Sequence, residues 1–231
     1  MREIDESTPW GCVVGRFQPF HNDHLSLVEE AFAHHGRVIV AVTNADPSWR
    51  FPVSEAPHRH LSAANPFTYP QRCELIRAAL AGIPVDRLRI TPFPLHDPNR
   101  WEQHLASSAV CWVRDRGPWE TRKIADLSSR YRVHVPPSNL SSPSSLSNLS
   151  TISGSKIRDL MRNRDSSWRS MVPSSVAHLI DGWLCDGGLD ATLDGSRSGA
   201  EVLPTHTRRT RESEFFGGRD AEGMVGGTHL G

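Results

Sequence analysis

The sequence contains little lysine, no paired cysteines and no long apolar run. Only two of its 26 basic residues are lysine, Lys123 and Lys156, so arginine and histidine must make nearly every contact with an anion. The formal net charge is zero, which argues against a chain-wide surface for nucleic acid. No run approaches the ~20 apolar residues of a membrane-spanning helix. These absences and the polar, acidic residues 1–9 predict a cytoplasmic protein without a nucleic-acid or membrane partner.

The four cysteines share no paired spacing. They are Cys12, Cys73, Cys111 and Cys185. Zinc sites and redox motifs place cysteines only about two to four residues apart. Three of the four also fall within apolar patterns, where a free thiol behaves as a small hydrophobic side chain. We therefore expect free thiols, most of them buried, rather than disulfides or zinc ligands.

The length leaves room for one folded domain and a tail. A chain of 231 residues with 37% apolar content can bury one sizeable α/β core. Ten of the 17 glycines fall after Asp186, among polar residues with few periodic apolar positions. Such a composition is typical of disorder. The sequence thus predicts a polar extension at 1–9, a folded domain at 10–185 and a disordered tail at 186–231.

Apolar runs alternate with helical patterns along the expected domain. Residues 37–43 are a continuous β-branched run, as in a parallel strand covered on both faces. One helix is opened by the capping-box pattern Thr68-x-x-Gln71. The expected strands are 10–14, 37–43, 87–93, 109–114 and 131–135, and the later helices are 100–105, 118–129 and a final amphipathic one around 176–184. This alternation predicts an α/β fold with a doubly wound parallel five-stranded sheet and a C-terminal helical segment.

The segment from Gly15 to His24 joins the first expected strand to the first expected helix. A turn that opens a helix points free N–H groups and the positive end of the dipole outward, so it is an anion site in itself. Gly15 permits close approach of a ligand, Arg16 adds a cation, and Pro19 stiffens the turn. His21 and His24 lie three residues apart on one face of the helix, where both can donate to phosphate oxygens. Taken alone, such a pair is more often a surface pair or half of a metal site.

A second helix start, at residues 152–158, also suits an anion. Ser153, Ser155 and Arg158 surround its first turn, so two hydroxyls, backbone N–H groups and one guanidinium can form a cradle. The plainer alternative is a serine-capped helix with an exposed Lys156 and Arg158. In a doubly wound sheet, ligands bind beyond the carboxyl ends of the strands, where the first of the two turns falls.

Residues 44–66 form a long connection rich in proline, serine and histidine. A loop of this length in a compact domain is usually functional or mobile. His58, Arg59 and His60 can close over a bound polyphosphate, but a solvated loop tip is the preferred interpretation.

Both turns resemble signatures of the nucleotidyltransferase superfamily. Residues 15–24, Gly-Arg-Phe-Gln-Pro-Phe-His-Asn-Asp-His, are closely similar to the first signature of the archaeal-type nicotinamide mononucleotide adenylyltransferases, with Asp23 where that family usually has glycine. Residues 152–158, Ile-Ser-Gly-Ser-Lys-Ile-Arg, resemble the second signature. The segments 65–68 and 165–173 are also similar to the family, so the resemblance covers the expected folded domain.

The resemblance implies a Rossmann-like nucleotidyltransferase fold and transfer of a nucleoside monophosphate from CTP or ATP, with Mg²⁺ and release of pyrophosphate. A phosphate or phosphonate acceptor is already ionised near neutral pH, so alignment and charge neutralisation suffice without a general base. The catalytic residues that it implies are His21, His24 and Arg158. The nucleotide-binding residues that it implies are Gly15, Arg16, Phe17, Gln18, Ser153, Gly154 and Ser155. Mg²⁺ would be held largely by phosphates and water, and no residue is named as its ligand.

The acceptor site departs most from the family. Archaeal-type enzymes hold the nicotinamide nucleotide with an Asp, Asn and Trp cluster after the third strand, and Asp97, Asn99 and Trp101 resemble it at compressed spacing. Where the family usually has Ser-Gly-Asn after the fourth strand, this chain has Arg114 and Arg116 on either side of an aspartate. Extra arginines there suit a small acidic acceptor. The variant is similar to a divergent actinobacterial branch that includes the phosphonoformate cytidylyltransferase.

The sequence therefore supports two functions equally: cytidylyl transfer to a phosphonate such as phosphonoformate, and adenylyl transfer to nicotinamide mononucleotide. In either case the partners are a nucleoside triphosphate and a small phosphorylated or phosphonate substrate, and a homo-oligomer is left open. The alternative from another class is a non-catalytic nucleotide-binding or regulatory protein.

Overall fold

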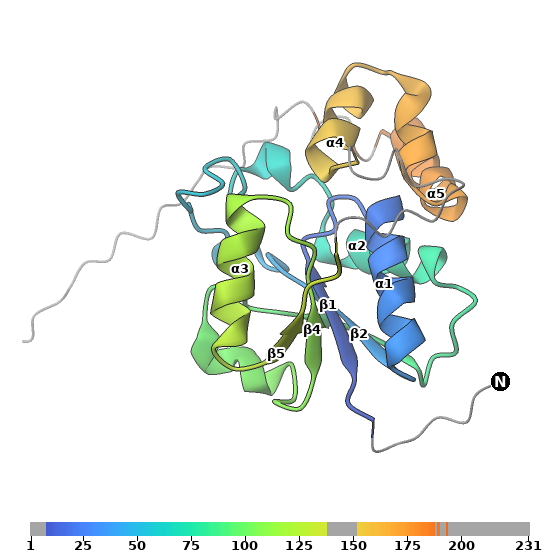
Figure 1. Ribbon diagram of the computed structural model, residues 1–231. Coiled ribbons are helices and arrows are strands. Elements are labelled where there is room, and N and C mark those ends of the chain that lie inside the picture. The colour runs from blue at the N-terminus through green and yellow to red at the C-terminus, as the bar shows by residue number, and fades with distance from the viewer. Residues whose placement is uncertain (1–7, 138–151, 188, 190–192, 194–231) are drawn as a thin grey trace, which may run out of the picture. The chain divides into compact units, whose positions relative to one another are not determined.

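A five-stranded parallel sheet forms the centre of the folded domain. The computed structural model describes residues 8–137, 152–187, 189 and 193. The strands are β1 (Gly11–Gly15), β2 (Val38–Val42), β3 (Leu88–Pro92), β4 (Val110–Trp112) and β5 (Arg132–His134). They lie in the order β3-β2-β1-β4-β5, and every neighbouring pair is parallel (Figure 1). The predicted doubly wound α/β fold is confirmed.

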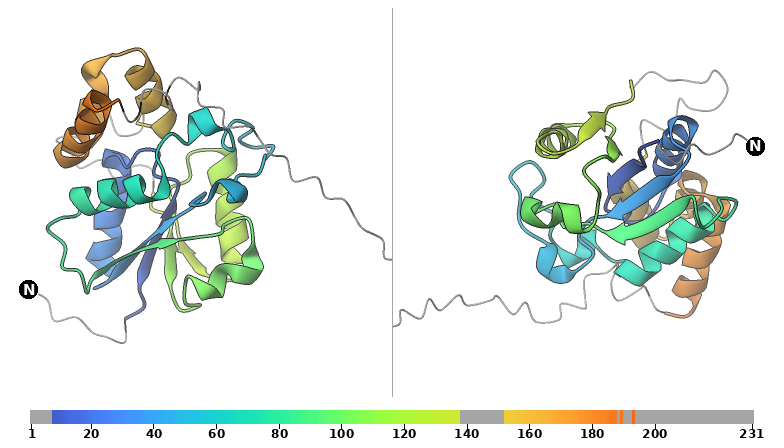
Figure 2. Two further views of the ribbon diagram at one scale, coloured as in Figure 1. Left: turned by 180° about the vertical axis from the view of Figure 1, so that it is seen from behind. Right: turned by 90° about the horizontal axis from the view of Figure 1, so that it is seen from below.

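Helices cover both faces of this sheet. The α-helices are α1 (Asn22–His34), α2 (Tyr69–Ala79), α3 (Pro118–Ser128), α4 (Gly154–Arg162) and α5 (Ser174–Cys185). Short 3-10 helices are Pro47–Trp49, Ser62–Ala64, Pro98–Gln103 and Ser166–Met171. Apolar side chains of α1, α2, α4 and α5 share a core cluster with one face of the sheet, and those of α3 share a second cluster with the other face. The views in Figure 2 show α1 and α3 on opposite sides of the strands.

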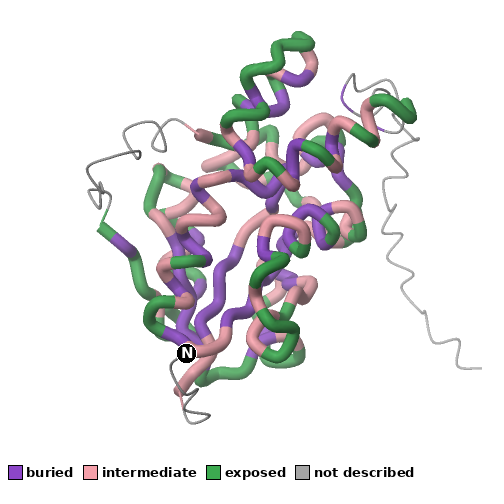
Figure 3. Tube along the Cα trace, turned by 90° about the vertical axis from the view of Figure 1, so that its right-hand side faces the viewer, coloured by how far each residue is buried: buried purple, intermediate pink, exposed green. Residues whose placement is uncertain are grey.

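Successive residues of β1 point to opposite faces of the sheet. Cys12 and Val14 belong to the cluster under α3, whereas Val13 belongs to the cluster under α1. β2 is buried along its whole length, as its β-branched run predicts for a strand covered on both sides. The buried strands appear as purple stretches of the trace in Figure 3.

The helix starts follow the predicted signals. Thr68 N donates to Gln71 Oε1 at 2.9 Å and Gln71 N donates to Thr68 Oγ1 at 3.4 Å, so the predicted capping box opens α2. α1 and α3 each begin a few residues after the carboxyl ends of β1 and β4, so their first turns meet at one edge of the sheet. Within the described ranges, no helix has the length and apolar character needed to cross a membrane.

The four thiols are free, as expected. Cys12, Cys73 and Cys111 are buried, and Cys185 is exposed. Cys12 and Cys111 lie opposite each other on the neighbouring strands β1 and β4. Both belong to the core cluster under α3, where they fill space as small apolar side chains.

The folded domain extends past its predicted end at residue 185. Leu189 and Leu193 are 1% and 4% exposed and belong to the core cluster that α5 joins. Arg162 on α4 fixes this segment, because its Nε donates to the main-chain oxygen of Leu193 at 2.9 Å. The sequence pattern does not reveal these leucines, since they stand singly among glycines and polar residues. Residues 1–7 of the predicted extension and the remainder of the predicted tail lie outside the described residues.

Candidate active site

Two cavities open beyond the carboxyl ends of the central strands. The first, of about 480 Å³, we call the histidine cavity. Its lining includes residues 13–18, His21, Asp23, His24, Arg59, Val113, Arg114, Arg116, Glu120, Lys123, residues 152–155 and Arg158. The second, of about 450 Å³, we call the aromatic cavity. Its lining includes Trp49, Phe51, Leu95, His96, Trp119 and Arg122, and Arg16 and Arg59 line both cavities.

The turn after β1 is held by buried aromatic rings. Phe17 and Phe20 are almost fully buried, and the Phe17 ring packs edge-on against His24 with centroids 4.8 Å apart. A Cβ on Gly15 would lie 2.9 Å from the Phe17 ring, so glycine is required for this packing. Phe17 itself adopts a left-handed backbone conformation, with φ of 53°, which is uncommon outside glycine. The turn is thereby fixed in place before α1 begins.

The two motif histidines form a stacked pair at the start of α1. Their ring centroids lie 3.6 Å apart, with 18° between the ring planes. The His21 main-chain N–H donates to His24 Nδ1 at 3.3 Å, so the proton of the neutral His24 ring lies on Nε2. Burial and the charges of Arg116 and Arg158 lower the pKa of His21 to about 3, and burial and the His21 ring lower that of His24. Both rings are therefore neutral near pH 7, and each keeps one N–H to donate.

The second motif closes directly onto the first. Arg158 on α4 donates through Nη1 to the Gln18 main-chain oxygen at 2.7 Å and through Nη2 to Ser155 Oγ at 3.1 Å. A Cβ on Gly154 would lie only 2.7 Å from the same Gln18 oxygen, so the close approach of the two segments requires glycine there. Ser153 accepts from Lys156 N at 3.2 Å and caps α4, as the plainer interpretation predicts, but Arg158, which that interpretation has exposed, is buried. Burial lowers the pKa of Arg158 to about 10, but it stays charged near pH 7.

Several polar atoms in this wall are buried without a hydrogen-bond partner in the part of the chain that the structure describes. They include the Nε atoms of Arg16 and Arg158. Leaving such a group unpaired costs about 1–3 kcal/mol. An anion in the histidine cavity would satisfy donors of this kind, so the wall has the chemistry of a phosphate site.

Arg16 and Arg72 fix the turn after β1 through hydrogen bonds to main-chain oxygens. Arg16 Nη1 donates to the main-chain oxygens of Arg59 and Ala64, each at 3.2 Å. Burial and the neighbouring arginines Arg59, Arg158 and Arg72 lower the pKa of Arg16, which shows how much positive charge gathers here. Arg72 is fully buried and donates to the main-chain oxygens of Arg16, Thr43 and Asn44 at 2.8 to 2.9 Å. Sequence analysis missed Arg72, because a single arginine in a helix normally faces solvent.

The Gln18 side chain connects the first motif to residues 65–68. Its Nε2 donates to the Phe67 main-chain oxygen at 2.8 Å, and its Oε1 accepts from Phe67 N at 3.0 Å. These two hydrogen bonds fasten the first motif to residues 65–68. Gln18 also lines the histidine cavity, so its expected part in nucleotide binding stays a prediction.

Arg114 and Arg116 line the histidine cavity as expected, but they are not a free pair of cations. Asp23, which stands where the resembling family has glycine, is buried and accepts from Arg116 Nη2 at 2.5 Å. Arg114 Nη2 bonds Glu30, and Arg114 Nε lies 3.5 Å from Asp23 Oδ1. Two carboxylates of α1 therefore balance the two arginines. The expectation that both guanidiniums are available to grip an acceptor is corrected.

The Asp, Asn and Trp cluster expected for the acceptor does not form. Trp101 is fully buried in the core under α3, where its Nε1 donates to the Pro94 main-chain oxygen at 2.9 Å. Asp97 caps the 3-10 helix by accepting from Asn99 N at 3.2 Å. None of the three lines either cavity. The assignment is wrong because a large ring in a short helix gains more from burial against the sheet than from an exposed site.

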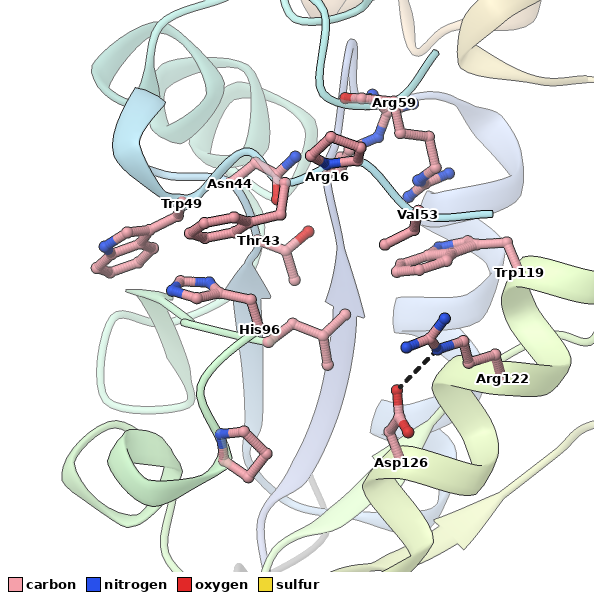
Figure 4. Close-up of a pocket in the computed structure, with 14 residues that line it drawn as sticks. Arg16, Thr43, Asn44, Trp49, Val53, Arg59, His96, Trp119, Arg122 and Asp126 are labelled. Carbon is pink, nitrogen blue, oxygen red and sulfur yellow. Dashed lines mark hydrogen bonds and ion pairs between the residues drawn. The ribbon is translucent and has the colours of Figure 1, made fainter. Parts of the chain in front are cut away.

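Other aromatic side chains line the second cavity. The His96 ring packs against both Trp49 and Phe51, with centroids 5.7 Å and 4.9 Å apart respectively. Figure 4 shows Trp49 and His96 on one side of the cavity and Trp119 on the other, with Arg16 and Arg59 near its upper edge. The Arg59 guanidinium stacks over Trp119 at 4.7 Å. Trp49 and Phe51 come from the loop 44–66, and sequence analysis did not select them because they belong to no regular pattern.

The loop is not a solvated tip at Arg59. This residue is half-buried and lines both cavities, and burial lowers the pKa of its guanidinium to about 10. His58 is exposed, and neither His58 nor His60 lines a cavity. Lys123 and Glu120 on α3 line the histidine cavity as well. Sequence analysis passed over both because isolated charges in a helical pattern usually mark its solvent face.

Known proteins resemble this chain over most of the folded domain. A family model described as cytidylyltransferase-like matches residues 12–160. The phosphonoformate cytidylyltransferase of Streptomyces viridochromogenes is 28% identical over 173 residues, covering 74% of this chain and 89% of that protein. The nicotinamide-nucleotide adenylyltransferase of Sulfurisphaera tokodaii is 26% identical over 177 residues, covering 72% of this chain and 87% of that protein. That of Haloarcula marismortui is 28% identical and covers 74% and 80%.

A solved structure shares the fold. It is a bifunctional NMN adenylyltransferase/ADP ribose pyrophosphatase from Francisella tularensis, with a TM-score of 0.54 and 15% sequence identity. The match covers 81% of this chain and 53% of that one, so this chain spans about half the length of the bifunctional protein. At this identity the likeness concerns the Rossmann-like sheet and its flanking helices.

Proposed function

This chain belongs to the cytidylyltransferase-like family and is a nucleotidyltransferase, and on that premise we propose that it moves the nucleoside monophosphate of CTP or ATP onto a small phosphate- or phosphonate-bearing acceptor. The observation that carries the proposal is the meeting of two motifs at one cavity. His21 and His24 open α1, Arg158 lies on α4, and all three line the histidine cavity. Neutral imidazole donors, helix N-termini and guanidiniums together suit a triphosphate.

The reaction needs alignment and charge neutralisation from these residues. An ionised oxygen of the acceptor forms a bond to the α-phosphorus, while the bond from that phosphorus to the bridging oxygen of pyrophosphate breaks and its electron pair leaves with pyrophosphate. His21 and His24 donate N–H groups to the phosphoryl oxygens, and Arg158 and Arg16 offset their charge. No proton is removed from the acceptor, because its phosphate or phosphonate is already ionised.

Mg²⁺ enters this proposal as part of the nucleotide substrate. The described residues contain no group of three His, Cys, Asp or Glu side chains placed to hold a metal ion. Asp23, the carboxylate nearest the histidines in sequence, is paired with Arg114 and Arg116. Mg²⁺ commonly keeps several waters and binds through substrate phosphates, so a magnesium–triphosphate complex fits such a site.

The acceptor would lie in the aromatic cavity. Arg16 and Arg59 line both cavities, so an acceptor phosphate held by them lies beside the triphosphate site. The first candidate is adenylyl transfer to nicotinamide mononucleotide. The rings of Trp49, Phe51 and His96 support it, because they provide the flat apolar wall that a nicotinamide ring requires.

The second candidate is cytidylyl transfer to a small phosphonate such as phosphonoformate. It is supported by Arg114 and Arg116 in place of the Ser-Gly-Asn of the adenylyltransferases, and by the similarity to the Streptomyces enzyme. The pairing of these arginines with Asp23 and Glu30 weakens a direct grip on the acceptor but leaves the altered segment at the nucleotide cavity.

A substrate matrix tests the proposal. ATP, CTP, GTP and UTP are each combined with nicotinamide mononucleotide or a small phosphonate, and pyrophosphate release is measured. Pyrophosphate from ATP with nicotinamide mononucleotide selects the first candidate, and pyrophosphate from CTP with the phosphonate selects the second. Tight nucleotide binding without pyrophosphate from any pair would contradict transfer and favour a non-catalytic nucleotide-binding protein.

A further inference from the structure

Lys123 occupies the floor of the histidine cavity. It lies on α3, is 8% exposed, and its Nζ donates to the main-chain oxygen of Val14 at 3.3 Å, near the carboxyl end of β1. The other lysine of the chain, Lys156, is exposed on α4 and lines neither cavity. A buried ammonium at the point where β1, α1 and α3 meet thus distinguishes Lys123 from an ordinary surface lysine.

The described residues provide little stabilisation for the positive charge of the buried Lys123 ammonium group. An ammonium group has three donors, and the described residues give Lys123 one hydrogen bond, to a neutral carbonyl. Burying a cation without a paired anion is costly, and an apolar side chain would pack at the same position without that cost. Glu120, one turn earlier on α3, favours the charge, but its carboxylate also interacts with Arg16 and Arg59. The arrangement is stable with a charged lysine when an anion fills the cavity.

The groups that face Lys123 come from every surrounding element. Burial lowers the pKa of Lys123 to about 8, with Glu120 of α3 and Cys111 of β4 raising it and Arg59 of the loop and Arg16 after β1 lowering it further. The charge of Lys123 in turn lowers the pKa of His24 on α1, so the two groups lie within electrostatic reach of each other.

We propose that Lys123 is a further catalytic residue, whose ammonium group donates from the cavity floor to the phosphoryl group being transferred. This inference rests on the proposed nucleotidyl transfer. His21 and His24 approach that group from the start of α1, and Lys123 approaches it from α3. Lys123 keeps all its protons while the acceptor oxygen bonds to the α-phosphorus and pyrophosphate leaves, so it acts by offsetting charge on the non-bridging oxygens.

Substitution tests the catalytic part. Lys123→Met should fold and lower kcat by about 10²-fold, because a positioned donor to the transferring group is typically worth about 10²–10³ in rate. Lys123→Arg should retain more turnover and lose the decline in activity that deprotonation of Lys123 causes at alkaline pH. Arg130→Met, which removes an exposed cation just beyond the end of α3, is the matched control and should match the wild type. A folded Lys123→Met protein with kcat within threefold of wild type would overturn the proposal.

A spectroscopic readout does not depend on turnover. Protein labelled with ¹³C at lysine Cε gives two side-chain signals, since the chain has two lysines, and Lys156→Arg assigns them. CTP or ATP with MgCl₂ and no acceptor should raise the pKa of Lys123 by about 1 or more and leave Lys156 unchanged. An unchanged Lys123 in an enzyme that releases pyrophosphate refutes this inference alone. A shifted Lys123 signal with no pyrophosphate from any substrate pair refutes the proposed transfer and leaves the phosphate contact standing.

If Lys123→Met does not fold, the pH dependence of activity of Lys123→Arg tests the proposal instead. An arginine variant whose activity declines at the same alkaline pH as the wild type would show that Lys123 does not carry the charge used in the reaction.

Discussion

Arg158 Nη1 donates to the main-chain oxygen of Gln18 at 2.7 Å, across 140 positions of sequence. This bond joins the two motifs, because Arg158 lies on α4 and Gln18 lies in the turn after β1. A single guanidinium therefore fixes the distance between the two segments. Changes at this contact should affect the reaction more than they affect the fold.

Gly154→Ala should separate the two motifs. The added Cβ would lie 2.7 Å from the Gln18 oxygen, so the start of α4 must move away. Overpacking of this kind costs about 1–3 kcal/mol of stability, and a displacement near 1 Å can lower turnover by about 10²-fold. Urea unfolding and pyrophosphate release measure the two effects. The control is Gly182→Ala on α5, where a Cβ meets nothing within 4 Å, and equal behaviour of the two variants would refute the prediction.

His21→Ala and His24→Ala should leave the fold intact and each lower turnover by about 10²–10³, the usual effect of losing a positioned donor. Circular dichroism checks the fold and pyrophosphate release checks the rate. His58→Ala, at an exposed position of the loop 44–66, is the control. A double alanine variant with unchanged kinetics would contradict the assignment of His21 and His24 to the active site.

Stability should fall on acidification because His21 is buried as a neutral ring. Below its ordinary pKa of 6.5 the unfolded chain binds a proton at this residue, whereas the folded protein does so only near pH 3. The free energy of unfolding should therefore fall by about 1 kcal/mol for this histidine between pH 7 and pH 5.5. Urea titrations at both pH values test this. His21→Asn should lessen the fall, and a wild-type protein equally stable at both pH values would contradict the prediction.

Two truncations should differ in stability. Ending the chain after Asp186 removes the buried Leu189 and Leu193, and burial of one leucine is typically worth about 1.5–3 kcal/mol. Ending it after Ser198, the last residue of the compact unit that contains the sheet, should keep both leucines in place. Thermal unfolding compares the two proteins. If both melt together with the full chain, the packing of residues 189 and 193 contributes nothing to stability.

Phe51→Ala tests the acceptor cavity without disturbing the core. The side chain of Phe51 is 53% exposed, so its loss should leave stability nearly unchanged. If the acceptor carries a nicotinamide ring, loss of stacking worth about 0.5–1.5 kcal/mol should raise its KM roughly threefold to tenfold. The KM of the triphosphate should stay constant, and Val85→Ala, at a residue 93% exposed, serves as control. A KM for nicotinamide mononucleotide that does not change would remove the aromatic wall from the acceptor site.

Local patterns revealed the helices, the strands and the two motifs that line the histidine cavity. Strand alternation, the capping box at Thr68 and the two helix starts depend on neighbours within a few residues, so a single sequence contains them. Partners distant in sequence decided the rest. Arg116 is paired with Asp23, which lies 93 positions away. The Gln18 carboxamide is hydrogen-bonded to the main chain of Phe67, which lies 49 positions away.

The sequence also did not reveal in which direction individual side chains point. Trp101 fitted an acceptor pattern by spacing, but its helix turns the ring into the core. Lys123 fitted a solvent-facing helix, yet its position on α3 directs the ammonium toward β1. Periodicity assigns a residue to a helix, whereas the tilt of that helix against the sheet determines which side chains reach the ligand cavity.

Because Arg16 and Arg59 line both cavities, the proposed sites for the triphosphate and the acceptor share two cations, and binding at one should be linked to binding at the other. An anion in one cavity changes the charge that these guanidiniums present to the other. Whatever factor the triphosphate imposes on the dissociation constant of the acceptor, the acceptor must impose the same factor on that of the triphosphate. If both substrates bind where we propose, the affinity measured for either one alone should differ from its affinity in the ternary complex.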